Sequence, residues 1–141
     1  MADLRVRGGG RRESGAFLLA QRADRERTIQ EWLPYDVLDP QSLRYAYVKL
    51  DTEAFPRLWD VCAAREVQVV ADIHTHPLGP GQSSSDRSHP MVSIAGHVAL
   101  IAPRFALGPV SPKDVSFNIY LGSGQWSSFY REQAAALIIA S

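Results

Sequence analysis

The sequence predicts a single α/β (α+β) domain, a sandwich of several strands with two or three helices. A continuous apolar run that includes residues 69–71 is typical of a buried strand. Apolar residues at helical spacing form a stripe within residues 53–65. Shorter apolar or alternating segments, separated by glycine and proline turns, fill the rest of the chain. Its 141 residues suit one domain with one core.

The amino-terminal part, residues 1–12, is expected to be flexible and poorly tied down, with any helix there missing or cut short. Residues 1–12 include the stretch Arg-Gly-Gly-Gly-Arg-Arg, which has no apolar period and indicates a flexible basic segment. The domain is therefore expected to span residues 13–141. Its first strand is expected at residues 16–21, and a second at residues 28–37, broken near Pro34.

The next two expected elements are a strand and a helix. Residues 43–50 alternate and read as a strand. Thr52 is placed to cap a helix over residues 53–65. The side chains expected to form the apolar stripe of this helix are Phe55, Leu58, Trp59 and Cys62.

Further strands and a short helix are expected in the second half. The expected strands cover residues 66–76, 97–103, 116–121 and 125–130. A short helix at residues 84–93 is expected to be interrupted by Pro90. The apolar stretch 134–140 is expected to pack as a final helix or strand.

Two histidines one residue apart close the apolar strand at 66–76. In a strand, residues i and i+2 point to the same face, so His74 and His76 project side by side. Two such imidazoles can bind one metal ion at about 2.0–2.1 Å. The turn at residues 79–81 returns Asp86, which can supply a third ligand. Two histidines and one carboxylate leave a fourth position for water, as in catalytic zinc sites.

Each part of this pattern has an alternative interpretation. A histidine pair on a strand is more often two ordinary polar residues. The run from Ser83 to Asp86 is also a helix-start signature, in which the serine caps the helix and the acid bonds back to it. The combination of buried strand, histidine pair, tight turn and capped acid favours the metal site.

These residues resemble the motif of a known enzyme family. His74-Thr75-His76-Pro77 followed by Ser83 and Asp86 resembles the zinc motif of the JAMM (MPN-plus) metalloproteases. Residues 13–19 are similar to the Glu-Thr-Gly-Gly-x-Leu-Leu stretch of prokaryotic JAB-type members, and residues 96–103 resemble their next core strand. The spacer before Ser83 is about one residue shorter than the family pattern, so Ser84 is an alternative for that serine.

The resemblance implies a structure and a set of roles. The fold would be a curved mixed sheet with helices packed outside and the metal at one edge. Zn²⁺ would be held by His74, His76 and Asp86. Glu13 would take a proton from the zinc-bound water and later give it to the leaving amine. Ser83 would donate a hydrogen bond to the oxyanion.

The resemblance also implies a substrate class. JAMM proteins cleave isopeptide or peptide bonds after the carboxyl-terminal tail of ubiquitin or a ubiquitin-like protein, and prokaryotic members often accompany activating or conjugating enzymes. Such a tail is the expected partner here. One alternative is release of cysteine or another small group from a sulfur-carrier protein. Another is a non-catalytic scaffold, which the intact Glu13, His74, His76 and Asp86 argue against.

Composition excludes several classes of function. The formal charge is zero, so no basic excess indicates nucleic-acid binding. No apolar run approaches the roughly 18–20 residues that span a bilayer, and no signal peptide is visible. The single cysteine, Cys62, fits a reducing compartment, so a cytoplasmic protein is expected. His89 and His97 are expected to be ordinary imidazoles, although His89 could contact the metal ligands.

Overall fold

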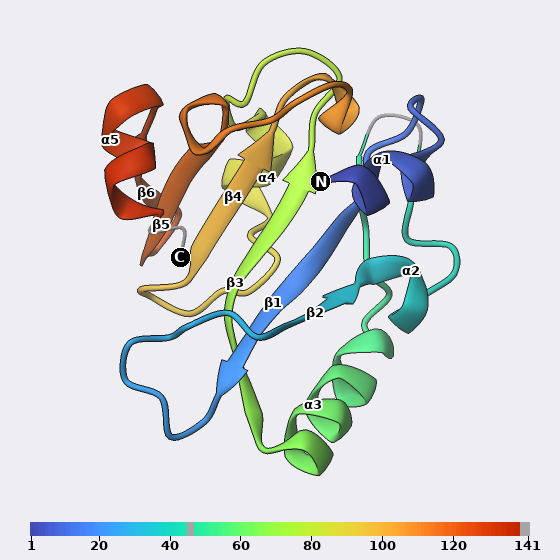
Figure 1. Cartoon of the computed structure of the whole chain (residues 1–141). Helices are drawn as coiled ribbons and strands as arrows, with labels where there is room; N and C mark the ends of the chain where they lie inside the picture. The colour runs from blue at the N-terminus through green and yellow to red at the C-terminus, as the bar shows by residue number, and fades with distance from the viewer. Residues whose placement is uncertain (45–46, 139–141) are drawn as a thin grey trace.

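The chain forms a single mixed sheet in the computed structural model, which describes residues 1–44 and 47–138 (Figure 1). The strands are β1 (Gly15–Gln21), β2 (Glu31–Pro34), β3 (Val67–Thr75), β4 (Val98–Ala102), β5 (Ser116–Gly122) and β6 (Gln125–Phe129). Their order in the sheet is β2-β1-β3-β4-β5-β6. Only β3 and β4 run parallel among these described strands. A parallel pair needs a long crossover, and that crossover carries the segment after His76.

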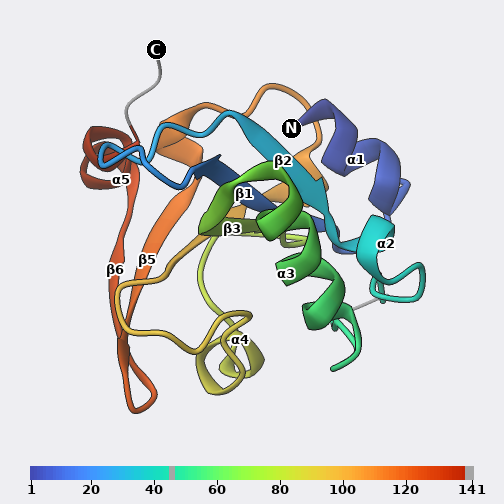
Figure 2. The same ribbon diagram turned by 90° about the horizontal axis from the view of Figure 1, so that it is seen from below.

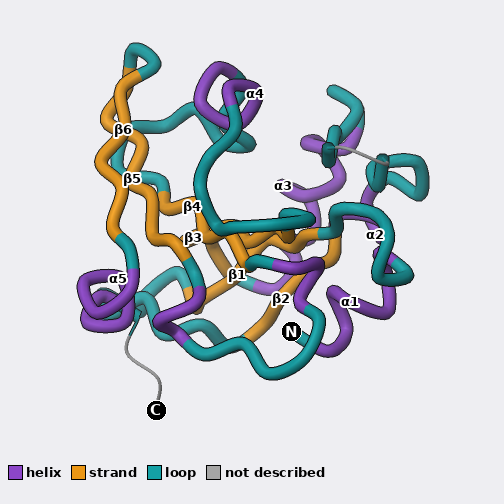
Figure 3. Tube along the Cα trace, turned by 90° about the horizontal axis from the view of Figure 1, so that it is seen from above, coloured by secondary structure: helices purple, strands orange, loops and turns teal. Residues whose placement is uncertain are grey.

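Helices cover both faces of the sheet. They are α1 (Ala2–Gly8), α2 (Tyr35–Leu38), α3 (Ala54–Arg65), α4 (Ser84–Ser88) and α5 (Arg131–Leu137), with two 3₁₀ turns, η1 (Arg104–Ala106) and η2 (Pro112–Asp114). Figures 2 and 3 show α3 and α4 on one face, and α1 and α5 on the other. The α/β class and the single domain are confirmed. No helix in the described part of the chain combines the length and apolar character needed to cross a bilayer.

The two faces of the sheet bury separate apolar clusters. One lies under α2 and α3 and includes Phe17, Tyr35 and Leu58, each 0% exposed. The other includes Leu4 of α1 and Ile73 of β3. Because β3 is covered on both faces, its sequence is a nearly continuous apolar run rather than an alternating one.

Gly15 allows the ring of Tyr35 to pack against β1. A Cβ at this position would lie 2.6 Å from the carbonyl oxygen of Ile73 and would overlap the Tyr35 ring. We expect Gly15→Ala to lower the free energy of unfolding by about 1–3 kcal/mol, as overpacking does. Urea denaturation would measure it, with Gly81→Ala as control because a Cβ at Gly81 has no atom within 4 Å. Equal stability of Gly15→Ala and the wild type would contradict this account of Gly15.

The amino-terminal segment differs from the prediction. Residues 1–12 were expected to be flexible, yet Ala2–Gly8 form α1. Leu4 is 2% exposed in the second apolar cluster, and its carbonyl accepts a hydrogen bond from Ser14 Oγ at 2.6 Å. Arg7 contacts the carboxylates of Asp3 and Asp36. The expectation was wrong because tertiary contacts, which a seven-residue pattern does not reveal, hold this short helix.

Elements between β1 and β3 also depart from expectation. The broken strand at 28–37 is a strand only over Glu31–Pro34, since the next four residues are helical. In segment 43–50 the described residues form a single bridge, Leu43 with Val48, and Tyr45 lies outside the described residues. The helix expected at 53–65 is confirmed as α3, but Glu53 takes the N-cap position that was assigned to Thr52. Trp59 was expected in the buried apolar stripe of this helix, but it is 46% exposed to solvent.

The second half follows the prediction more closely. Strands β3 to β6 match their expected positions within about two residues. The helix expected at 84–93 is shorter and ends at Ser88, because the residue before Pro90 is disfavoured in helical conformation. The apolar end forms α5, which ends at Leu137, and residues 139–140 lie outside the described residues.

Candidate metal centre

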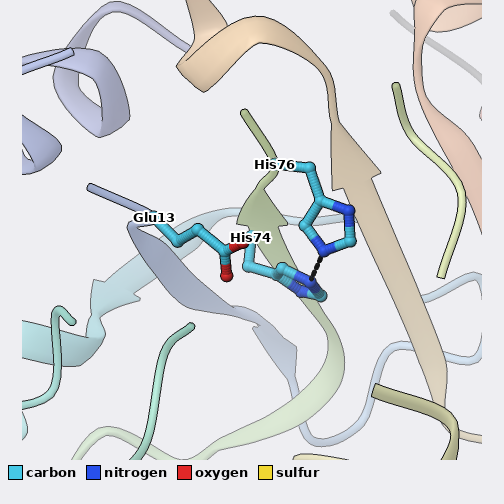
Figure 4. A group of neighbouring side chains, drawn as sticks. All are labelled: Glu13, His74 and His76. Atoms are coloured by element: carbon cyan, nitrogen blue, oxygen red, sulfur yellow. Dashed lines mark hydrogen bonds between the residues drawn. The ribbon is translucent and has the colours of Figure 1, made fainter. Parts of the chain in front are cut away.

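The ends of two interior strands bring the first candidate residues together. His74 and His76 lie at the carboxyl end of β3, and Gly15 of β1 is the register partner of His74. Continuing that antiparallel register by two pairs sets Glu13 opposite His76. Figure 4 shows the Glu13 carboxylate next to the two imidazoles. The group therefore lies at the strand ends in the middle of the sheet, not on an edge strand.

Three side chains place their possible ligand atoms close to one another. Nε2 of His74 and Nε2 of His76 are 3.0 Å apart. The Asp86 carboxylate reaches both rings, with Oδ1 at 3.4 Å from His74 Nε2 and Oδ2 at 3.2 Å from His76 Nε2. Ligands of a tetrahedral metal at about 2.0–2.1 Å are separated by about 3.3–3.4 Å. The three distances lie at or just below that spacing, and different Asp86 oxygens make its two contacts, so the predicted ligands His74, His76 and Asp86 lie together.

Glu13 completes a second possible donor set. It is 6% exposed, and its carboxylate lies within 4.8 Å of ligand atoms of both His74 and His76. A buried group of Glu13, His74 and His76 could therefore hold a metal ion. Burial raises the pKa of the Glu13 carboxyl, an effect that the neighbouring His76 and His74 partly offset. A raised pKa suits a carboxylate that must accept and then release a proton.

The charges in this group stabilise one another. Burial alone would lower the pKa of His74, but Asp72 and Asp86 outweigh it and raise that pKa to about 9. Partial burial alone would raise the pKa of Asp86, but His74 and His76 outweigh it and hold that pKa well below its usual range. The carboxylates therefore favour a cation between them, and a metal ion would compete with the proton on His74.

A capping box at the start of α4 holds Asp86. Ser83 is the N-cap residue, and its hydroxyl accepts a hydrogen bond from the Asp86 backbone N–H at 3.1 Å. The Asp86 carboxylate accepts one from the Ser83 backbone N–H at 2.6 Å. The helix-start interpretation and the ligand interpretation of this run are therefore compatible, since Asp86 Oδ2 serves both contacts. The shorter spacer still leaves Ser83, rather than Ser84, at the N-cap.

A left-handed turn that follows β4 holds the segment that leaves the end of β3. The three successive residues of η1 have φ of 53°, 50° and 56°, and none is glycine. The N–H of Phe105 donates to the carbonyl of His76 at 2.8 Å, and that of Arg104 donates to Leu78 at 3.0 Å. Left-handed backbone costs about 1–2 kcal/mol per residue. The backbone of η1 is therefore strained, and the hydrogen bond from Phe105 helps to hold the backbone of His76 in place.

Sequence reasoning missed a buried carboxylate beside the site. Asp72 is 1% exposed on β3. It accepts a hydrogen bond from Tyr35 Oη at 2.9 Å and one from His97 Nε2 at 2.6 Å. Its Oδ2 is 4.0 Å from Nδ1 of His74, a contact between charges rather than a hydrogen bond. The spacing of Asp72, His74 and His76 on one strand face was a signal that could have identified it.

The two further histidines differ from each other. His97 is 8% exposed and bound to Asp72, so it is part of a polar network rather than an ordinary packed imidazole. His89 is exposed at the end of α4, where its Nδ1 lies 3.3 Å from the Ser85 carbonyl. Among the described residues it makes no hydrogen bond to the candidate ligands.

Burial raises the pKa of the Cys62 thiol, as expected of a packed residue rather than a nucleophile.

A cleft of about 380 Å³ opens beside the candidate ligands. His74 and Asp86 line it together with residues 47–49, Gln82, Ser85, residues 89–91 and Trp126 of β6. Trp126 Nε1 donates a hydrogen bond to the Arg87 carbonyl at 3.1 Å, which ties β6 to α4. The cleft therefore gives a substrate-sized molecule access to the His74 and Asp86 side of the group.

Comparison with known proteins supports the fold. No protein-family model matches this chain. Among solved structures, it is similar to the solution structure of protein DSY2949 from Desulfitobacterium hafniense, with a TM-score of 0.60 and 15% sequence identity. The match covers 92% of this chain and 85% of that one. At this identity the similarity concerns the fold alone.

Proposed function

We propose that this chain is a zinc-dependent peptidase or isopeptidase of the JAMM type, which cleaves after the carboxyl-terminal tail of a ubiquitin-like protein. The observation that supports it best is the triangle of His74, His76 and Asp86, with distances of 3.0, 3.2 and 3.4 Å, beside the buried Glu13. The zinc motif in the sequence supports the same reading.

The donor set fits zinc. Two imidazole nitrogens and one carboxylate oxygen are one of the sets of three protein ligands that hold catalytic zinc. Zinc bound there would act as a Lewis acid and lower the pKa of a water molecule toward about 7. We assign the ligand role to Asp86 because its carboxylate contacts both rings, within 3.4 Å.

Glu13 supplies the proton transfers. Its carboxylate accepts the proton of the attacking water as the new C–O bond forms, and it then gives that proton to the amine nitrogen as the C–N bond breaks. Its burial limits competing contact with solvent water and its raised pKa favours the transfer. We therefore assign Glu13 the role of general base and acid rather than that of a metal ligand.

The cleft suits an extended polypeptide tail. Tyr47 and Trp126 provide aromatic contacts in its lining, and both are partly exposed. A tail that ends in small residues can pass such side chains and reach the ligands, while the body of the modifier stays outside. Lys49 is the one lysine or arginine of the described lining, so a strongly acidic tail is not favoured.

A cleavage assay tests this function. The zinc-loaded protein would be incubated with three substrates: a ubiquitin-like protein fused through its tail to a reporter, the same modifier joined to a lysine side chain, and a sulfur-carrier protein that bears a terminal cysteine. We expect cleavage of the first or second, and its loss in the presence of a chelator. Release of cysteine alone would favour the sulfur-carrier alternative. Cleavage of none would contradict the proposed function.

Ser83→Ala separates the two roles of the serine. Loss of the cap should cost about 0.5–2 kcal/mol of stability, and loss of an oxyanion donor should lower kcat by about 10²–10³-fold. We expect a large fall in kcat with KM little changed and a small fall in melting temperature. Ser84→Ala is the matched control. Full activity in Ser83→Ala would contradict the donor role, and activity lost only in Ser84→Ala would transfer that role to Ser84.

A further inference from the structure

Asp72 is a buried carboxylate that the proposed reaction does not use. It is 1% exposed and precedes His74 by two residues on the same strand face. A buried carboxylate is costly unless it is paired and hydrogen-bonded. The arrangement of the groups around the Asp72 carboxylate therefore indicates its role.

Two buried donors fix this carboxylate. The Tyr35 hydroxyl donates to Oδ2 at 2.9 Å, and Nε2–H of His97 donates to Oδ1 at 2.6 Å. Tyr35 belongs to α2 and is 0% exposed, whereas His97 immediately precedes β4 and is 8% exposed. With each oxygen held by a different element, the carboxylate has little freedom to turn.

The two nitrogens of His74 have different neighbours. Nδ1 is 4.0 Å from Asp72 Oδ2. Nε2 is 3.0 Å from His76 Nε2 and 3.4 Å from Asp86 Oδ1. An imidazole that binds a metal through one nitrogen usually directs the N–H of the other to a carboxylate or carbonyl, which sets its tautomer and orientation.

We propose that Asp72, held by Tyr35 and His97, is a positioning residue that keeps a proton on Nδ1 of His74 and so leaves Nε2 free to bind the metal. This inference deepens the proposed function and rests on it for the metal. Loss of such a partner typically lowers metal affinity or activity by about 10–100-fold.

Zinc affinity, measured by competition with a chromophoric chelator, is the first test. We expect zinc binding about 10–100-fold weaker in Asp72→Ala than in the wild type. Asn118→Ala is the control, because Asn118 is also buried and is hydrogen-bonded on the sheet to Ala99 and Ser116, with no hydrogen bond to the candidate ligands. It should lose stability and keep its zinc affinity. Should Asp72→Ala fold poorly, Asp72→Asn keeps the volume and is expected to change affinity in the same direction.

The proton position gives a second readout that needs no metal. Nitrogen-15 NMR with chelator present, at about pH 10 and well above the ordinary pKa of histidine, shows which nitrogen of His74 carries the proton. We expect Nδ1 in the wild type and a shift toward Nε2 in Asp72→Ala. An unchanged proton position, or zinc affinity equal to wild type in the Asp72 variants, would overturn the inference. Failure of the wild type to bind zinc would instead overturn the proposed function, and the NMR result would still decide the role of Asp72.

Discussion

Replacing Glu13 by glutamine is expected to lower kcat by about 10²–10⁴-fold while the protein keeps its zinc. Glutamine has nearly the same shape but cannot accept the proton of the attacking water. Glu13 is assigned as the base, beside the ligands rather than among them, so metal binding should not depend on its charge. Single-turnover cleavage of a ubiquitin-like fusion, with zinc content measured on the same samples, checks both halves of this prediction.

Glu26→Gln is a suitable control for Glu13→Gln, because Glu26 is exposed and lies in the turn between β1 and β2. It should leave both turnover and zinc unchanged. Near-normal kcat in Glu13→Gln would exclude Glu13 as the base. Loss of zinc in the same variant would make Glu13 a ligand, as the alternative donor set of Glu13, His74 and His76 allows.

Replacing His76 by alanine is expected to remove most of the bound zinc, because the variant keeps only two of three protein ligands. Its backbone is held by hydrogen bonds with Ala102 and Phe105, so the fold should survive the loss of the side chain. Zinc content after dialysis, together with the thermal melt, measures the two effects separately.

His89→Ala is the matched control for His76→Ala. His89 also lines the cleft, but it is exposed and, among the described residues, makes no hydrogen bond to the candidate ligands. We expect it to retain about one zinc per chain. If His76→Ala retained as much zinc as His89→Ala, the assignment of His76 as a ligand would be wrong.

The sequence predicted the parts of the site that depend on local geometry. The two-residue period of a strand is enough to set His74 and His76 side by side, and the Ser83 to Asp86 spacing is enough to predict a capped acid. Both features are present, in β3 and at the start of α4. Glu13 was found through its resemblance to a family motif, and the β1–β3 register sets it opposite His76.

The parts that the sequence did not reveal depend on distant contacts. The role of Asp72 depends on its hydrogen bonds with Tyr35 and His97, which are 37 and 25 residues away along the chain. No periodicity links these three residues. Likewise α1 was missed because Leu4 is buried by the sheet and by η1, not by a pattern within the helix itself.

The most direct test of the central claim is a zinc-edge anomalous difference map from crystals of the zinc-supplemented protein. We predict one peak per chain, about 2.0–2.2 Å from Nε2 of His74, Nε2 of His76 and a carboxylate oxygen of Asp86, with the Glu13 carboxylate outside ligand distance. Absence of a peak at this position, or a peak bound by Glu13 in place of Asp86, would contradict the account.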